Sequence, residues 1–312
     1  MKIFLLSVAN YFCRLSDTIP RSEKKMWQKL YYNGMKLLCA IVIEIILKMK
    51  YCFKKQPFQP LIDDGKGIIV SLTSFPARIN SVWLVVDSLF SQTYRPAKIL
   101  LVLTKDEFPA GMEGVPKSLK RFLDKGLEIV FTEQNLRPHN KYYYALNTYR
   151  DRNIITVDDD LYYWSDTIQR LMELHRQHPD CVCGNSVLRI NMNSDRFEFE
   201  HLQTNDVSFS NLAQGVCGVL YPMNFRSEEL FNIDSINRMS LTADDQWLKA
   251  QGMLMKINVA SGEGYFHPLM LVGSQKIALW HKNMGNHESS VVWSCLYRYY
   301  ELNKVYEKYL DD

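Results

Sequence analysis

Three consecutive aspartates, Asp158, Asp159 and Asp160, follow a short apolar run at residues 153–157. The run is typical of a buried strand, which would end in an acidic loop. Three adjacent carboxylates repel one another, and the simplest group that would compensate them is a divalent cation that takes oxygen ligands. The triplet therefore predicts a metal site for a phosphorylated substrate. The alternative is a solvated acidic turn that caps the next helix.

A second acidic pair, Asp244 and Asp245, opens a segment with the pattern of a helix. A carboxylate at such a position can act as a general base that takes a proton from an attacking hydroxyl group. The same two side chains would also cap the helix and interact favourably with its dipole. The pair alone leaves both interpretations open.

The elements that must position these carboxylates alternate between strands and helices. This alternation predicts an α/β fold with a doubly wound, mostly parallel, Rossmann-like sheet. Ligands of such sheets bind at the carboxyl ends of the strands, where the triplet lies. We expect strands at residues 67–72, 98–104, 127–131 and 154–157, helices at 80–91, 116–125, 141–149 and 166–178, and strand-like pieces within 182–209.

Composition sets the broad class. The 312 residues are 47% hydrophobic and 23% charged, which allows a full α/β core and excludes a disordered chain. The seven cysteines are odd in number and form no paired CxxC framework, so we expect free thiols in a reducing compartment. Cys181 and Cys183 alternate as in a strand, which favours core packing over metal binding.

The basic charge is concentrated in the N-terminal arm, where residues 1–60 carry eleven Lys and Arg against three Asp and Glu. Its apolar run at 37–47 contains Glu44 and is shorter than the ~20 residues of a membrane-spanning helix. Basic and aromatic residues flank the run, as in a helix that lies on an anionic membrane surface. The alternative is a helix packed on the main domain. The apolar run argues against nucleic acid as the partner of this basic charge.

Pro57, Pro60 and the glycine-containing stretch that follows them are typical of a linker. We therefore expect a helical N-terminal extension at residues 1–62 and one globular domain at 63–312.

Four motifs in this order resemble bacterial nucleotide-sugar glycosyltransferases with the GT-A fold, of the family 2 type. Residues 88–99, with Gln92-Thr93-Tyr94, resemble the family's helix-to-strand turn, and the aspartate triplet falls where the family keeps its DxD motif. Residues 215–222 resemble the glycine-rich segment beside the acceptor site. Asp244 and Asp245 resemble the acidic pair that opens the catalytic helix. The resemblance covers residues 67–290.

The resemblance implies a metal-dependent transfer of sugar from a nucleoside-diphosphate sugar, most simply a UDP-sugar, to a glycan or lipid-linked glycan. It places this reaction in bacterial surface polysaccharide synthesis, in the cytoplasm and peripherally on the inner face of the cell membrane. Nucleotide-sugar binding would occupy residues 66–160, acceptor binding and catalysis 161–290, and a C-terminal helix 289–310.

Several roles follow at the donor side. Asp160 would bind Mn²⁺ or Mg²⁺ together with Asp158, which would also face the ribose or donor sugar, and Asp159 would lie between them. A histidine would complete the metal site, His281 in the first place and His287 in the second. The other donor-binding candidates are Thr73, Arg78, Lys141, Arg137 and His139, with the last four near the phosphates, and Asp106 for the base.

At the acceptor side an inverting enzyme needs one carboxylate as general base, and Asp245 is the first candidate before Asp244. Gly215 and Gly218 would line the acceptor site, while Trp247 would either stack on a sugar ring or pack in the core. Asn185 and Arg189 are further candidates. The competing interpretations are a retaining transferase on the same fold, a metal-dependent phosphoesterase, and a carbohydrate-binding protein without catalysis.

Overall fold

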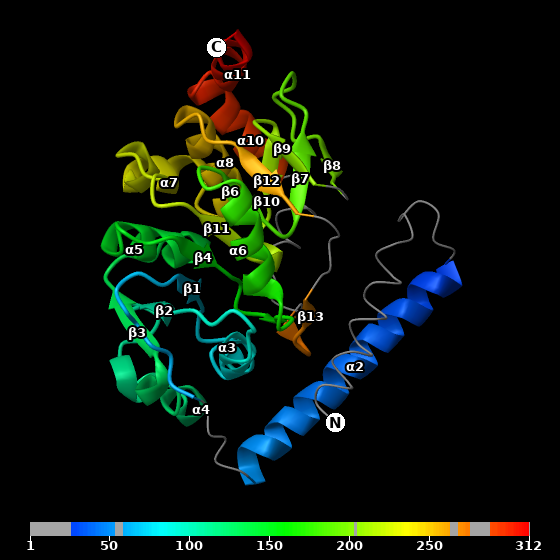
Figure 1. Cartoon of the computed structure of the whole chain (residues 1–312), viewed down its shortest axis with the longest axis vertical. Helices are drawn as coiled ribbons and strands as arrows, with labels where there is room; N and C mark the ends of the chain where they lie inside the picture. The colour runs from blue at the N-terminus through cyan, green and yellow to red at the C-terminus, as the bar shows by residue number, and fades with distance from the viewer. Residues whose placement is uncertain (1–25, 54–58, 203–204, 263–267, 275–287, 312) are drawn as a thin grey trace.

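The computed structural model of the protein describes residues 26–53, 59–202, 205–262, 268–274 and 288–311 (Figure 1). A mixed sheet with the strand order β3-β2-β1-β4-β11-β6-β12-β9 forms its centre. The expected α/β fold with a mostly parallel sheet is confirmed. The strands are β1 (Ile69–Thr73), β2 (Lys98–Thr104), β3 (Leu127–Thr132), β4 (Ile154–Thr156), β6 (Val182–Gly184), β9 (Asp206–Ser208), β11 (Val219–Tyr221) and β12 (Val259–Ser261).

The strands β3, β2, β1 and β4 are parallel neighbours, so their carboxyl ends share one edge of the sheet. β11 runs antiparallel between β4 and β6, with Val219 opposite Thr156, and thereby brings the segment before it to the same edge. Two smaller sheets complete the fold. They are β10 (Asn211–Ala213), β7 (Val187–Ile190) and β8 (Phe199–His201), and the pair β5 (Leu161–Tyr162) with β13 (Leu269–Met270).

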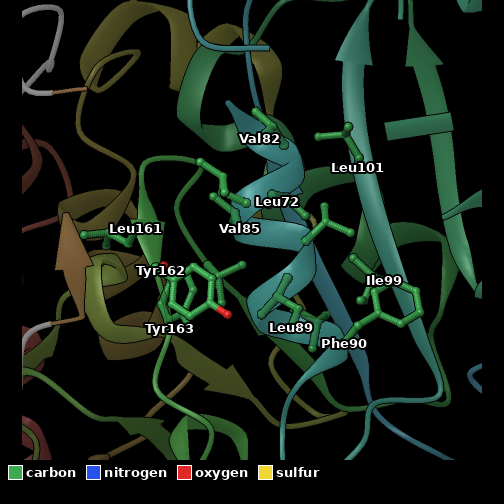
Figure 2. Close-up of a cluster of buried hydrophobic side chains, with 14 of the residues drawn as sticks. Leu72, Val82, Val85, Leu89, Phe90, Ile99, Leu101, Leu161, Tyr162 and Tyr163 are labelled. Atoms are coloured by element: carbon green, nitrogen blue, oxygen red, sulfur yellow. The ribbon is translucent and has the colours of Figure 1, made fainter. Parts of the chain in front are cut away.

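Alternate side chains of the strands enter two buried clusters on opposite faces of the sheet. From β2, Ile99 and Leu101 join one cluster, whereas Leu100 and Val102 join the other. The first face is covered by helix α3 (Val82–Phe90), whose Val85 and Leu89 belong to the same buried cluster as Leu72 and Ile99 of the sheet (Figure 2).

Helix α5 (Asn140–Thr148) contacts β1, β2 and β4 and contributes to the second cluster. In the described part of the domain, the other helices are α4 (Lys117–Lys120), α6 (Thr167–Gln177), α7 (Ile233–Met239), α8 (Asp244–Leu254), α10 (Glu288–Tyr299) and α11 (Leu302–Asp311).

Two expected helices are broken. The segment 116–125 forms only α4 and a 3₁₀ turn at Leu123–Lys125, and Gly126 follows it with a φ of 110°. The C-terminal segment 289–310 divides into α10 and α11. Glu301, between them, has a φ of 49°, a left-handed conformation that ends the regular hydrogen bonding of a helix.

The N-terminal helix α2 (Met26–Phe53) is 28 residues long, well beyond the apolar run at 37–47. Its part Met26–Met49 is long and apolar enough to cross a membrane by length and composition alone, so the apolar helix is longer than the run at 37–47 predicted. Cys39, Ala40, Ile43 and Leu47 are buried in the first core cluster, and α2 contacts β13 (Figure 1). Large apolar side chains elsewhere on α2 remain exposed, among them Trp27, Leu30, Leu37, Leu38, Ile45 and Met49.

Helix α8 is buried along most of its length and carries a lysine without a carboxylate partner in the described part of the chain. The Nζ atom of Lys249 donates a hydrogen bond to the carbonyl of Phe209 and lies 5.2 Å from the centre of its ring. Burial lowers the pKa of Lys249 to about 7, because a charged ammonium group is poorly solvated in the core.

We expect the stability of the protein to depend on pH through Lys249. The folded pKa of about 7 lies below the unfolded value of about 10.4, so between these pH values the unfolded chain holds one more proton. The free energy of unfolding should then rise by up to about 1.4 kcal/mol per pH unit from this group. In Lys249→Met this contribution should vanish, as measured by denaturant unfolding from pH 7 to 10. The exposed control Lys117→Met should retain the wild-type slope.

Candidate active site

The aspartate triplet lies where β1 and β4 end side by side. Ser71 of β1 pairs with Thr156 of β4, and the amide of Val157 donates to the Ser71 carbonyl at 3.0 Å. The loop after β1 and the triplet after β4 therefore leave the sheet at the same edge. This arrangement follows from parallel pairing, which places both carboxyl ends together.

Asp159, the middle carboxylate, is held by the loop after β1. Its Oδ2 accepts a hydrogen bond from the Ser74 hydroxyl at 2.5 Å, and its Oδ1 accepts one from Arg78 Nη1 at 2.6 Å. Burial raises the pKa of Asp159, although Arg78 and Ser74 act in the opposite direction. The Asp159 carboxylate therefore anchors Arg78, a contact that the sequence analysis did not foresee.

Arg78 also reaches the third aspartate. Its Nη2 lies 3.1 Å from Asp160 Oδ2 and donates to the Ser274 carbonyl at 3.2 Å. Burial and the negative charge of Asp158 raise the pKa of Asp160 to about 7, even though Arg78 lowers it. Arg78 thus contacts both Asp159 and Asp160.

Lys141 joins the triplet to the second acidic pair. Its Nζ lies 2.8 Å from Asp158 Oδ1 and 2.9 Å from Asp244 Oδ2, and its side chain is buried. Burial by itself would lower the pKa of Lys141, but the surrounding aspartates raise it well above its usual value. The lysine therefore stays charged and ties the end of β4 to the first turn of α8.

The two members of the acidic pair differ in environment. Asp244 is buried, and the ammonium group of Lys141 outweighs this burial and lowers its pKa. Asp245 remains partly exposed, and both its carboxylate oxygens lie near the Gly215 amide, at 3.1 and 3.2 Å. Burial of its carboxyl group and the charge of Asp244 raise the pKa of Asp245 to about 8. Asp244 is therefore the ionised partner, while Asp245 exchanges a proton near neutral pH.

Gly215 is at the centre of this arrangement, and a side chain there would crowd two charged groups. A Cβ atom would lie 3.0 Å from Lys141 Nζ and 3.2 Å from Asp245 Oδ1. Gly218 has a different role. It has a φ of 86° and is buried against Thr167 and Leu171 of α6, so it shapes the turn into β11.

The indole of Trp247 is fully buried, and its Nε1 donates to the Leu230 carbonyl at 3.2 Å. The interpretation as a sugar-stacking residue is therefore wrong, and core packing is correct. His139 is also fully buried, within electrostatic reach of Asp244 and Lys141. Its ring nitrogens contact the Tyr142 hydroxyl at 3.0 Å and the Ser240 carbonyl at 2.7 Å.

The other candidates are scattered. Thr73 donates to the Val102 carbonyl at 2.8 Å, beside the loop that carries Arg78. Arg137 is exposed at the start of the turn before α5, and Asp106 contacts Asn135 at 3.2 Å at the surface. Asn185 bonds to main-chain carbonyls, and Arg189 pairs with Asp206. His281 and His287 lie outside the described residues.

The turn at Gln92 has a structural role that the resemblance did not supply. The Gln92 amide nitrogen donates to the Trp164 carbonyl at 2.7 Å, and its oxygen accepts from the Ile168 amide at 3.1 Å. Tyr163 is a further missed residue, since its hydroxyl accepts a hydrogen bond from the Asp158 amide at 2.7 Å. These contacts fix the chain on either side of the triplet. No sequence signal links Tyr163 to Asp158, because the contact requires a tight turn.

Among the described residues, no group of three or more His, Cys, Asp or Glu side chains is arranged to hold a metal ion. Two carboxylates, Asp158 and Asp160, nevertheless lie at the same edge of the sheet, where burial and then the charge of Asp158 raise the pKa of Asp160. A Mg²⁺ site commonly takes one or two carboxylates and completes its shell with water and substrate phosphates. Asp158 and Asp160 fit such an ion, which would take its other ligands from water and substrate phosphates.

Comparisons with solved structures give several partial similarities. One is 4-diphosphocytidyl-2C-methyl-D-erythritol synthase from Anaerococcus prevotii DSM 20548, at 11% identity and a TM-score of 0.43, over 72% of this chain and 98% of that one. Another is S. aureus TarS 1-349 in complex with UDP, at 10% identity and a TM-score of 0.40. The similarity covers 62% of this chain and 57% of that one. A third is the mannosyltransferase PcManGT from Pyrobaculum calidifontis in complex with GDP-Man and Mn²⁺, at 13% identity and a TM-score of 0.42. The similarity covers 80% of this chain and 70% of that one.

No curated protein matches the sequence. Residues 77–232, however, match the family model described as glycosyl transferase family 2. The match includes the aspartate triplet, the arginine and lysine that hold it, and the glycine-rich segment. It extends over half of the 312 residues, so the chain belongs to glycosyl transferase family 2 and is a glycosyltransferase.

Proposed function

We propose that this glycosyltransferase transfers a sugar from a nucleoside-diphosphate sugar to a hydroxyl group of a glycan or lipid-linked glycan, with inversion at the anomeric carbon. The observation that supports this proposal best is that Lys141 joins the aspartate triplet to the acidic pair of α8. Its Nζ atom lies 2.8 Å from Asp158 and 2.9 Å from Asp244. One group suits the leaving diphosphate and the other the attacking hydroxyl.

On the donor side, Asp158 and Asp160 would hold a Mn²⁺ or Mg²⁺ ion. Such an ion stabilises the negative charge that gathers on the nucleoside diphosphate as the glycosidic bond breaks. Arg78 and Lys141 add fixed positive charge beside these carboxylates. The donor in this proposal is a UDP-sugar, and Asp106 is a candidate for contact with its uracil base.

On the acceptor side, Asp245 would accept the proton of the attacking hydroxyl group. It is the partly exposed member of its pair, and its pKa of about 8 suits proton exchange near neutral pH. Buried Asp244 would remain ionised and hold Lys141 in place. Gly215, whose amide orients Asp245, would leave room for the acceptor.

The exposed apolar side chains of α2 support a third part of the proposal. They form a surface on which the exposed Lys48 also lies, as in helices that bind anionic membranes. We propose that α2, within the extension 1–62, holds the domain 63–312 on the inner face of the cell membrane. A lipid-linked acceptor in surface polysaccharide synthesis would be presented there.

Replacing the proposed base tests the mechanism. Asp245→Asn should lower kcat by about 10²–10⁴-fold, because an amide cannot take the proton. The matched control is Asp234→Asn, an exposed aspartate in the first turn of α7, which should retain wild-type kcat. The kcat of both variants is measured from initial rates with the nucleotide-sugar that the thermal-shift screen identifies. ¹H NMR of the first product should show the inverted anomer, and full activity of Asp245→Asn would remove the base assignment.

A thermal-shift screen of UDP-, GDP-, CMP- and dTDP-sugars, with and without Mn²⁺, tests the donor site. Ligands that bind only the folded protein raise the unfolding temperature, so one nucleotide should stabilise the chain, and more strongly with the ion. Asp160→Asn should lose the Mn²⁺-dependent part of the shift. Exposed Asp151→Asn should keep it. Equal shifts for Asp160→Asn and wild type would exclude Asp160 as a ligand.

Flotation with vesicles tests the membrane surface. The full chain should float with vesicles of mixed anionic and neutral lipids. The double variant Leu37→Ser/Leu38→Ser should bind about tenfold more weakly per leucine, because less apolar surface enters the lipid. Asn33→Ser, exposed on the same helix, should bind like wild type. Unchanged binding of the double variant would contradict membrane contact through this surface.

A further inference from the structure

The segment 268–274 lies directly beside the aspartate triplet. Its strand β13 pairs with β5, the strand that follows Asp160, so that Met270 is opposite Leu161. Beyond β13, the Leu271 amide donates to the Asp160 carbonyl at 2.9 Å. Arg78 Nη2 donates to the Ser274 carbonyl at 3.2 Å. Both Asp160 and Arg78 are therefore bonded to the main chain of this segment.

The same segment is held from the other side by helix α2. Glu44 is buried among the apolar residues with which α2 packs on the domain, and its Oε1 accepts a hydrogen bond from the Val272 amide at 2.5 Å. Its Oε2 accepts one from Lys48 Nζ at 2.9 Å, a lysine whose side chain is 58% exposed. A buried carboxylate needs such partners, since leaving it without hydrogen bonds would destabilise the packed helix.

These contacts form a continuous path from α2 to the site. It runs from Glu44 to Val272, through the neighbouring Leu271 to the main chain of Asp160, and through Ser274 to Arg78. The Ser274 hydroxyl closes the turn by donating to the Leu271 carbonyl at 2.8 Å. Residues 272 and 273 thus lie in a short turn whose two ends contact the site and whose middle contacts α2.

We propose that Glu44 is a positioning residue of the donor site, which acts through the segment 268–274 on Asp160 and Arg78. Its carboxylate fixes the turn after β13, and the turn fixes the Asp160 main chain and the second contact of the Arg78 guanidinium. Helix α2 is then a part of the donor site and not only an extension of the domain. The assignment of Asp160 and Arg78 to the donor rests on the proposed function, whereas their link to Glu44 does not.

Three variants of the full chain separate the contacts of Glu44. Glu44→Leu removes the acceptor for the Val272 amide, and Glu44→Gln retains an amide oxygen for it. Lys48→Met removes only the exposed partner. If the bond to Val272 matters, Glu44→Leu should differ from wild type, while Glu44→Gln and Lys48→Met should resemble it.

The first measurement is amide hydrogen exchange in the absence of any ligand. Glu44→Leu should raise exchange on the order of tenfold in peptides covering 268–274 and 156–163, as expected for the loss of one hydrogen bond to a charged group. Peptides covering β2 and β3 should exchange as in wild type. Unchanged exchange at 156–163, or an equal rise in β2 and β3, would overturn the proposal.

The second measurement is the affinity for the nucleotide-sugar identified by the thermal-shift screen, in the presence of Mn²⁺. Glu44→Leu should bind on the order of tenfold more weakly, and Glu44→Gln should restore the affinity. Wild-type affinity in Glu44→Leu would overturn the positioning role. If wild type binds none of the nucleotide-sugars, the proposed function fails, and hydrogen exchange at 156–163 still decides whether Glu44 positions Asp160.

Discussion

Negative charge converges at one edge of the central sheet, and two cations with largely buried side chains make this possible. Lys141 bridges Asp158 and Asp244, while Arg78 bridges Asp159 and Asp160. Removing either cation would leave buried carboxylates without compensation, which is far more costly than losing an exposed ion pair. The position of α8, the conformation of the triplet and the ionisation of its members all depend on these two side chains.

The topology explains how residues distant in sequence share this edge. β11 is inserted antiparallel between β4 and β6, so the glycine-rich segment before it enters the site from the side opposite to the loop after β1. Gly215 then lies close to Lys141 and orients Asp245 through its amide. The acidic pair becomes two unequal groups as a result, with Asp244 in the ion pair and Asp245 at the partly exposed position.

Much of the donor half could be predicted because its signals are local. The strand expected at 98–104 is β2 as observed, and the strand at 154–157 differs from β4 by one residue. Predictions about single side chains were weaker. Trp247 is buried in the core and does not face a sugar site. His139 contacts Tyr142 and Ser240, and Arg78, expected near the phosphates, pairs with two aspartates. Each of these depends on which distant segment packs against the residue, and residue type alone does not encode that.

The sequence by itself determined the α/β class, the location of the aspartate triplet at a strand end and the family resemblance, because apolar periodicity and short motifs act within a few residues. Only the tertiary structure decided what each carboxylate does. Charge compensation, burial and the raised pKa values of Asp160 and Asp245 arise between segments far apart in the chain. The same holds for Glu44, whose contact with Val272 joins residues 228 positions apart. Opposite charges and hydrogen-bond partners act over a few ångströms, and folding alone sets those distances.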